Sequence, residues 1–187
     1  MVDSKKLGSD SWLSFSFWLV VATFLTFLIH ELSHYFAGVA LGFDMWVNLN
    51  GAGPIGDIRP NQSQQTIITM AGPIVTVIQA SVAAIFIQSR KHLWGYSFVV
   101  SALLMRIFAF ATSMAIYPND EARVALSYGW PNWSIHAIIV SALLAATILA
   151  ARKAKVGILL NLLAFFLVSA SMAAIVLGSQ AYPVKFG

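Results

Sequence analysis

The sequence predicts an all-α polytopic membrane protein, with about five transmembrane helices and a small β-hairpin or re-entrant segment after the first. Hydrophobic residues make up 59% of the 187 residues and charged residues only 10%, whereas soluble domains average about 25% charged residues. Hydropathy also separates five apolar segments, each of about the length needed to cross a hydrocarbon core of about 30 Å. They run from Trp12 to about Leu41, Thr66 to Gln88, Leu93 to Tyr117, Ile135 to Ala151 and Val156 to Gly178.

The first predicted helix begins with 18 uncharged residues, Trp12 to Ile29. This run is longer than the core of a usual signal peptide, so we expect a retained helix. The longest connections, residues 42–65 and 118–134, leave no room for a soluble domain. We therefore expect one integral membrane domain over residues 1–187. The absence of cysteine excludes disulfides and thiolate metal sites, and nothing in the sequence indicates nucleic-acid binding.

Positive charges are concentrated in alternate connections. Seven Lys and Arg residues lie before the first helix, between the second and third, and between the fourth and fifth, against three on the opposite side. The positive-inside rule then predicts a cytoplasmic N-terminus and an outside C-terminus. The seven are Lys5, Lys6, Arg90, Lys91, Arg152, Lys153 and Lys155, and the three are Arg59, Arg123 and Lys185.

The connection from Asp44 to Arg59 has a strand-like pattern. Trp46 to Asn50 alternates apolar and polar residues before a Gly/Pro cluster, and a second short run begins at Ile55. This pattern predicts a small β-hairpin. Because two short strands are marginal alone, an irregular amphipathic connector is the alternative.

Two histidines and a glutamate interrupt the first apolar segment. His30, Glu31 and His34 form an H-E-x-x-H motif. Positions four apart share one helix face, so both imidazoles can bind one metal ion while Glu31 reaches a water molecule on it. The alternative is that the histidines only hydrogen-bond neighbouring helices and the glutamate pairs with a cation. Ionisable residues inside a membrane are costly and mark functional sites, so we favour a metal site, for which zinc suits imidazole.

Three motifs follow one another in a recognisable order. They are "HELSHYFAGVALG" at 30–42, "AGP" at 71–73 opening the next helix, and "YPNDEARVAL" at 117–126 after the third helix. With these motifs the chain resembles the site-2 proteases, which are intramembrane zinc metalloproteases. The family often has glycine where this chain has Glu121, and asparagine where it has Thr76. The resemblance implies a three-helix catalytic core in residues 12–125, with accessory helices in residues 134–187.

A third metal ligand must come from another helix. Two histidines supply only two ligand atoms, and a catalytic zinc usually takes three from the protein. The resemblance implies that Asp120 is the third, placed on a turn after Pro118 breaks the third helix. Glu121 and Asp57 are the rival carboxylates. A plainer alternative is that Asn119 or Asp120 only caps a following helical turn.

The resemblance implies a peptidase that cleaves within the membrane. One Zn²⁺ would be held by His30, His34 and Asp120, with Glu31 as the general base. The partners would be the lipid bilayer and a membrane-embedded peptide or single-span protein. Once unwound, such a peptide could add as a strand to an edge of the Asp44–Arg59 segment. A zinc transporter and a non-catalytic pseudoprotease that binds membrane peptides are the alternatives. Charge places the metal towards the outside, whereas the resemblance more often implies the cytoplasmic side.

Four further features have ordinary structural explanations. The "AGP" motif permits close helix packing, or holds the second helix against the metal-binding helix. Arg106, which is 14 residues before Asp120, is too far along a helix to pair with it, so we expect it to pair with a carboxylate from elsewhere or to line a cavity. His92 and His136 flank predicted helix ends, where we expect interfacial solvation and no metal binding.

Overall fold

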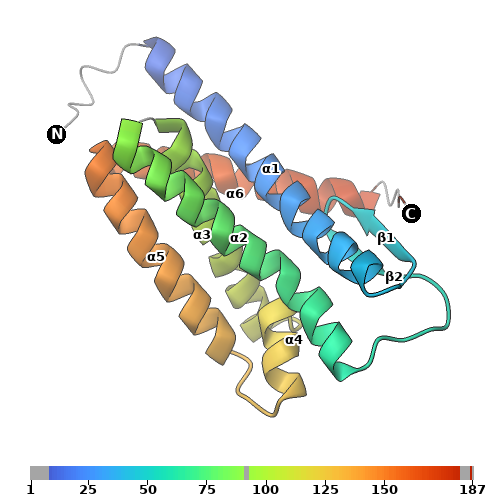
Figure 1. Ribbon diagram of the computed structural model, residues 1–187. Coiled ribbons are helices and arrows are strands. Elements are labelled where there is room, and N and C mark those ends of the chain that lie inside the picture. Colours follow the sequence, from blue (N-terminus) through green and yellow to red (C-terminus); the bar gives the residue numbers. More distant parts are fainter. Residues whose placement is uncertain (1–8, 91–92, 182–185, 187) are drawn as a thin grey trace.

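The structure, a computed structural model, describes residues 9–90, 93–181 and 186 (Figure 1). In chain order its elements are α1 (Ser9–Ala40), β1 (Met45–Asn48), β2 (Gly51–Pro54), α2 (Gln62–Arg90), α3 (Leu93–Ala115), α4 (Asp120–Ser127), α5 (Ser134–Ala154) and α6 (Ile158–Ala181). Within these residues, α1, α2, α3, α5 and α6 are long and apolar enough to cross a membrane. The predicted all-α membrane fold with five spans and a small hairpin is therefore confirmed.

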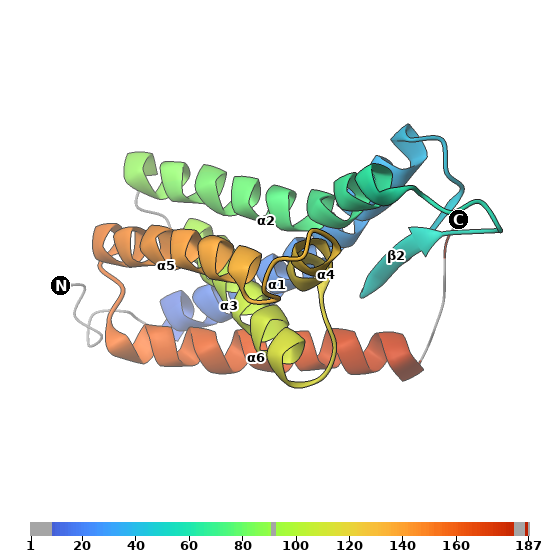
Figure 2. The same ribbon diagram turned by 90° about the horizontal axis from the view of Figure 1, so that it is seen from below.

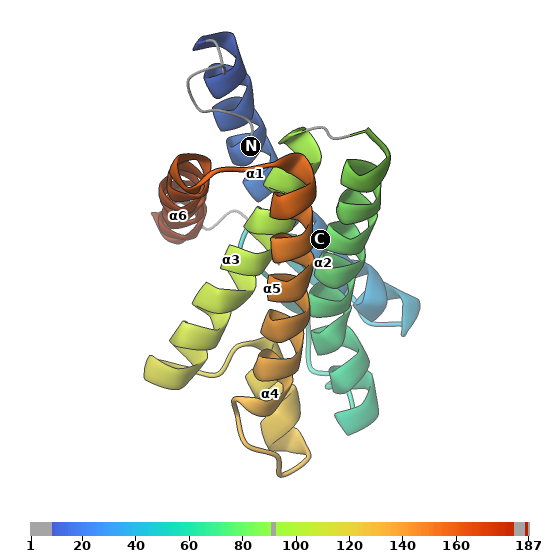
Figure 3. The same cartoon turned by 90° about the vertical axis from the view of Figure 1, so that its left-hand side faces the viewer.

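Helices α1, α2 and α3 pack against one another and form the centre of the bundle. Helix α5 covers α2 and α3, whereas α6 covers α1 and α3, so α2 and α6 lie on opposite sides (Figures 2 and 3). The outward faces remain apolar, as expected for a surface covered by lipid chains. Buried core residues include Phe15, Leu19, Tyr96, Val99 and Val168, and exposed apolar residues include Leu13, Ile85, Ile138, Leu149 and Phe166.

The hairpin forms, but its second strand lies earlier than predicted. Strands β1 and β2 are antiparallel with Asn48 opposite Gly51, so β2 occupies the Gly/Pro cluster and not the run that begins at Ile55. The two-residue connection fixes this register. The indole of Trp46 lies across the strand glycines, since a Cβ on Gly53 would be 3.1 Å from its Nε1. The missing side chains of β2 are thus replaced by a ring from β1.

Helix α2 begins at Gln62 and extends to Arg90, so the "AGP" motif does not open it. The expectation that this motif opens the helix is wrong, because Pro73 lies inside it. Proline has no N–H, and the carbonyl of Thr69 therefore lacks the bond that a regular helix would give it.

The chain reverses between α3 and α4. Pro118 cannot continue the helix, and the backbone N–H of Asn119 donates to Ser113 Oγ at 2.9 Å. The Asn119 side chain donates to the Ala109 carbonyl at 2.9 Å. Asn119 precedes α4 but makes no side-chain cap. These two bonds fold the first turn of α4 back onto α3.

The two ends of the bundle carry different structures. Helix α5 ends and α6 begins at the end where α1 starts, whereas the hairpin and the end of α6 lie at the opposite end (Figure 2). There Val47 and Phe186 form an antiparallel bridge, with N–H···O distances of 2.8 and 3.0 Å. An odd number of spans therefore separates the start of α1 from the end of α6.

Candidate metal centre

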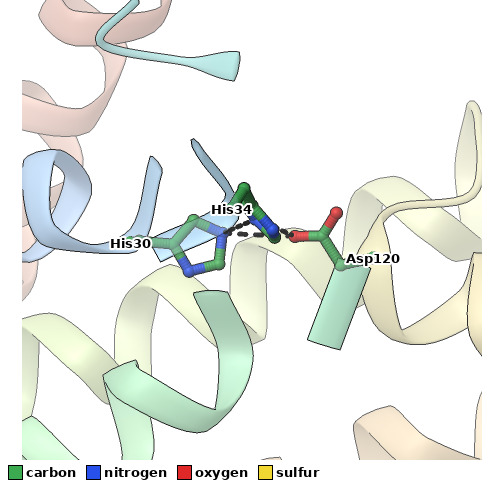
Figure 4. A group of neighbouring side chains, drawn as sticks. All are labelled: His30, His34 and Asp120. Carbon is green, nitrogen blue, oxygen red and sulfur yellow. Dashed lines mark hydrogen bonds and ion pairs between the residues drawn. The ribbon is translucent and has the colours of Figure 1, made fainter. Parts of the chain in front are cut away.

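Three predicted ligands converge between α1 and α4. His30 and His34 lie one turn apart on α1, and Asp120 is the first residue of α4. His30 Nε2 is 3.1 Å from His34 Nε2, and Asp120 Oδ2 is 3.2 and 3.4 Å from these two nitrogens. Figure 4 shows the two rings and the carboxylate facing one another. Among the described residues this is the group of side chains that could hold a metal ion, and Asp120 is its carboxylate.

The spacing of the three atoms matches the coordination of a small tetrahedral ion. Ligands bound at about 2.0–2.1 Å with tetrahedral angles are separated from each other by about 3.3–3.4 Å. The observed separations of 3.1, 3.2 and 3.4 Å are close to this value. The group therefore needs little rearrangement to bind a metal ion.

Hydrogen bonds at the far side of each ring set its tautomer. His34 Nδ1 lies 2.7 Å from the Ile68 carbonyl, which can only accept, so this nitrogen carries the proton. His30 Nδ1 lies 3.1 Å from Thr76 Oγ1, whose own hydroxyl donates to the Gly72 carbonyl. His30 Nδ1 must therefore donate as well. Both Nε2 atoms then direct lone pairs at the same point, as metal-bound histidines do.

Asp120 supplies the negative charge of the group. Its second oxygen, Oδ1, accepts from Arg123 Nη2 at 2.5 Å, which leaves Oδ2 for the histidines. Burial alone would raise the pKa of Asp120, but where the cluster shares a proton, hydrogen bonding to His30 and His34 outweighs burial and holds this pKa well below its ordinary value. Two lone pairs and a carboxylate within 3.4 Å repel unless a cation lies among them. The cluster therefore takes up either a shared proton or a metal ion.

Helix α2 approaches the two rings at Gly72. A Cβ at this position would lie 2.5 Å from His34 Nε2 and 2.6 Å from His30 Nδ1. No side chain fits in this space. Of the two interpretations of the "AGP" motif, the geometry favours the one in which α2 is held against α1 at the two histidines.

A buried polar network fixes α4. Arg106 Nη1 pairs with Glu121 Oε1 at 3.0 Å, and their side chains are 3% and 0% exposed. His136 Nδ1 lies 3.7 Å from Glu121 Oε2, and its Nε2 is 2.9 Å from Ser113 Oγ. Arg106 thus pairs with a carboxylate other than Asp120, as expected. The expectation of interfacial solvation for His136 is wrong, because His136 is completely buried.

The remaining predicted residues are separate from the ligand group. Glu121 is occupied by Arg106, and Asp57 is exposed on the connection after β2. His92 lies outside the described residues. Neither rival carboxylate joins the histidines. The sequence alone did not assign roles to Thr76, Ile68 or Arg123. For Thr76 there was a signal, because it stands where the resembled family often has asparagine.

The centre opens onto a cavity of about 870 Å³. Glu31 is 7% exposed, lines this cavity together with His30 and His34, and makes no hydrogen bond to the described residues. The backbone of β2, from Gly51 to Pro54, lines the same cavity. Within the described part of the chain, Glu31 is thus a buried carboxylate beside the candidate ligands, and no hydrogen bond occupies it.

Comparison with protein-family models, curated proteins and solved structures finds no match for this chain. The fold and the site define a polytopic membrane protein with a His-His-Asp group that can hold a metal ion. Any assignment of function therefore rests on the geometry of this group.

Proposed function

We propose that the chain is an intramembrane zinc metalloprotease of the site-2 protease kind. The observation that supports this most directly is the convergence of His30 Nε2, His34 Nε2 and Asp120 Oδ2, at tetrahedral spacing, beside Glu31. Two imidazoles and one carboxylate are a ligand set that suits zinc and leaves its fourth position open.

Each residue has a defined part in the proposed hydrolysis. A zinc ion held by the three ligands would lower the pKa of water towards about 7 and polarise a peptide carbonyl. Glu31 accepts the proton of the attacking water and later delivers it to the leaving amine. Arg123 keeps Asp120 oriented by holding Oδ1.

The substrate would be a membrane-embedded peptide or a single-span protein. A helical segment hides its carbonyls in internal hydrogen bonds, so it must unwind before cleavage. Strand β2 lines the cavity, and among the described residues it is paired only with β1. The edge of β1 instead holds Phe186, bridged to Val47. Strand β2 is therefore the edge on which an unwound peptide can be held by main-chain hydrogen bonds.

The substitution Glu31→Gln tests the proposal. The amide keeps the shape of the side chain but cannot accept the proton, so bound zinc should stay at the wild-type level while peptide cleavage falls by about 10²–10⁴-fold. The measurement compares zinc content with turnover of a membrane-peptide substrate in detergent.

Undiminished cleavage by this variant would contradict the role of Glu31. A zinc-loaded wild-type protein that cleaves no membrane peptide would indicate the pseudoprotease. Zinc flux through liposomes containing the protein would indicate the transporter.

A further inference from the structure

A second cavity, of about 600 Å³, lies between α3, α5 and the start of α6. It shares no lining residue with the cavity at the metal centre. Val100 and Leu103 of α3 and Leu144 and Ile148 of α5 form an apolar wall. We propose that this cavity binds an anionic phospholipid, with an acyl chain against the apolar wall and the headgroup phosphate at Arg152 and Lys155.

The cavity changes character along its length. Leu144 and Arg152 both line it and are eight residues apart on α5, which corresponds to about 12 Å along the helix. The charged end is therefore at the end of the bundle where α5 passes to α6 (Figure 2). An apolar groove with a polar mouth at a helix end matches a molecule with a long chain and a charged head.

The charge at the mouth is entirely positive. Arg152 and Lys155 line the cavity, no acidic residue does, and neither cation forms an ion pair within the described part of the chain. Basic pockets between transmembrane helices at a membrane face bind anionic headgroups. Charge complementarity therefore favours an anionic phospholipid over a zwitterionic one.

The backbone at Lys155 gives independent support. Among the described residues, Lys155 is the one non-glycine residue with a positive φ, at 55°. It ends α5 in the left-handed conformation, and its backbone N–H bonds to Ala151 and Arg152 carbonyls. Glycine fits this conformation without strain and makes the same backbone bonds. The conformation of this helix end therefore does not require a lysine, and the ammonium group is available to a ligand in the cavity.

Binding of phosphatidylglycerol with one palmitoyl and one oleoyl chain, measured by native mass spectrometry of the full chain in detergent, tests the proposal. The wild type should bind one molecule at least ten-fold more tightly than phosphatidylcholine with the same chains. Arg152→Gln and Lys155→Gly should each weaken this binding about ten-fold. Lys155→Gly should not lower the Tm, because it relieves backbone strain. A loss of lipid binding without a loss of stability separates a binding role from a structural one.

Lys153→Gln is the matched control, since Lys153 is exposed beside Arg152 and does not line the cavity. This variant should bind the lipid as the wild type does. Equal weakening by Lys153→Gln, or equal affinity for the two phospholipids, would overturn the proposal. Glycerol phosphate, which has the charge without the chain, should bind far more weakly, and equal binding would show that the cavity takes a free phosphate and not a lipid.

Discussion

The rings of His30 and His34 are held by different acceptors. His34 bonds to a main-chain carbonyl, which no substitution at Ile68 removes, whereas His30 depends on the hydroxyl of Thr76. Loss of such a supporting bond typically lowers metal affinity 10–100-fold. The orientation of His30 is therefore the more sensitive of the two to substitution.

Gly72→Ala should weaken metal binding without unfolding the protein. The new Cβ would lie 2.5 Å from His34 Nε2 and 2.6 Å from His30 Nδ1, so α2 or the rings must move. We expect zinc affinity to fall at least ten-fold, measured by competition with a zinc-binding dye. Gly178→Ala on α6 is the control, because nothing lies within 4 Å of its Cβ position. Equal zinc affinity in both variants would show that the close contact is unimportant.

Asp120→Asn should lower the zinc content far more than Asp57→Asn. Both changes remove one negative charge and keep the side-chain shape, but only Asp120 lies within 3.4 Å of both histidines. Bound zinc is measured by atomic absorption after removal of free metal. Wild-type zinc content in the Asp120 variant, with loss in the Asp57 variant, would show that the ligand assignment is wrong.

The sequence predicted the site where the spacing is local. His30, Glu31 and His34 share a helix face by periodicity alone. Gly72 could not be assigned in this way, because its contact with the rings depends on where α2 crosses α1. The pairing of Arg106 with Glu121 was equally hidden, since a distance along one helix does not apply when the chain reverses between α3 and α4.

At the scale of elements, α4 determines whether the centre is complete. It is eight residues long, too short to be stable by itself in water. It is held by the Arg106–Glu121 pair and by the bonds of Asn119 to α3. His136 adds a contact from α5, so a helix outside the expected catalytic core supports the helix that carries Asp120.

The buried pair should show strong coupling in stability. Glu121→Leu leaves a buried, uncompensated guanidinium, which typically costs about 3–5 kcal/mol. Adding Arg106→Met removes that charge, so the double variant should recover much of the apparent Tm lost in the single variant. The Tm is measured in detergent for both single variants and the double variant. Additive losses of Tm would show that the pair does not hold α4.

The hairpin, like the site, could be predicted from the sequence only in part. Its existence followed from the alternating pattern of Trp46 to Asn50, but the position of β2 did not. Glycine has a low preference for strands, and only the packing of the Trp46 ring over Gly51 and Gly53 explains why they form one. A cross-strand contact of this kind is set by register, which single-strand patterns do not contain.

For the whole molecule, the distribution of charge makes a prediction about orientation in the membrane. Five spans and the seven-to-three excess of Lys and Arg predict that the α5–α6 connection lies in the cytoplasm and the hairpin outside. The chain has no cysteine, so single cysteines report their position without background. Lys153→Cys and Asp57→Cys lie at exposed positions near opposite ends of the bundle. We expect a membrane-impermeant maleimide to label the Asp57 variant in intact cells, and the Lys153 variant only after permeabilisation.

The reverse pattern would mean that the centre faces the cytoplasm and that charge does not set the orientation. Labelling of both variants in intact cells would contradict the five-span topology.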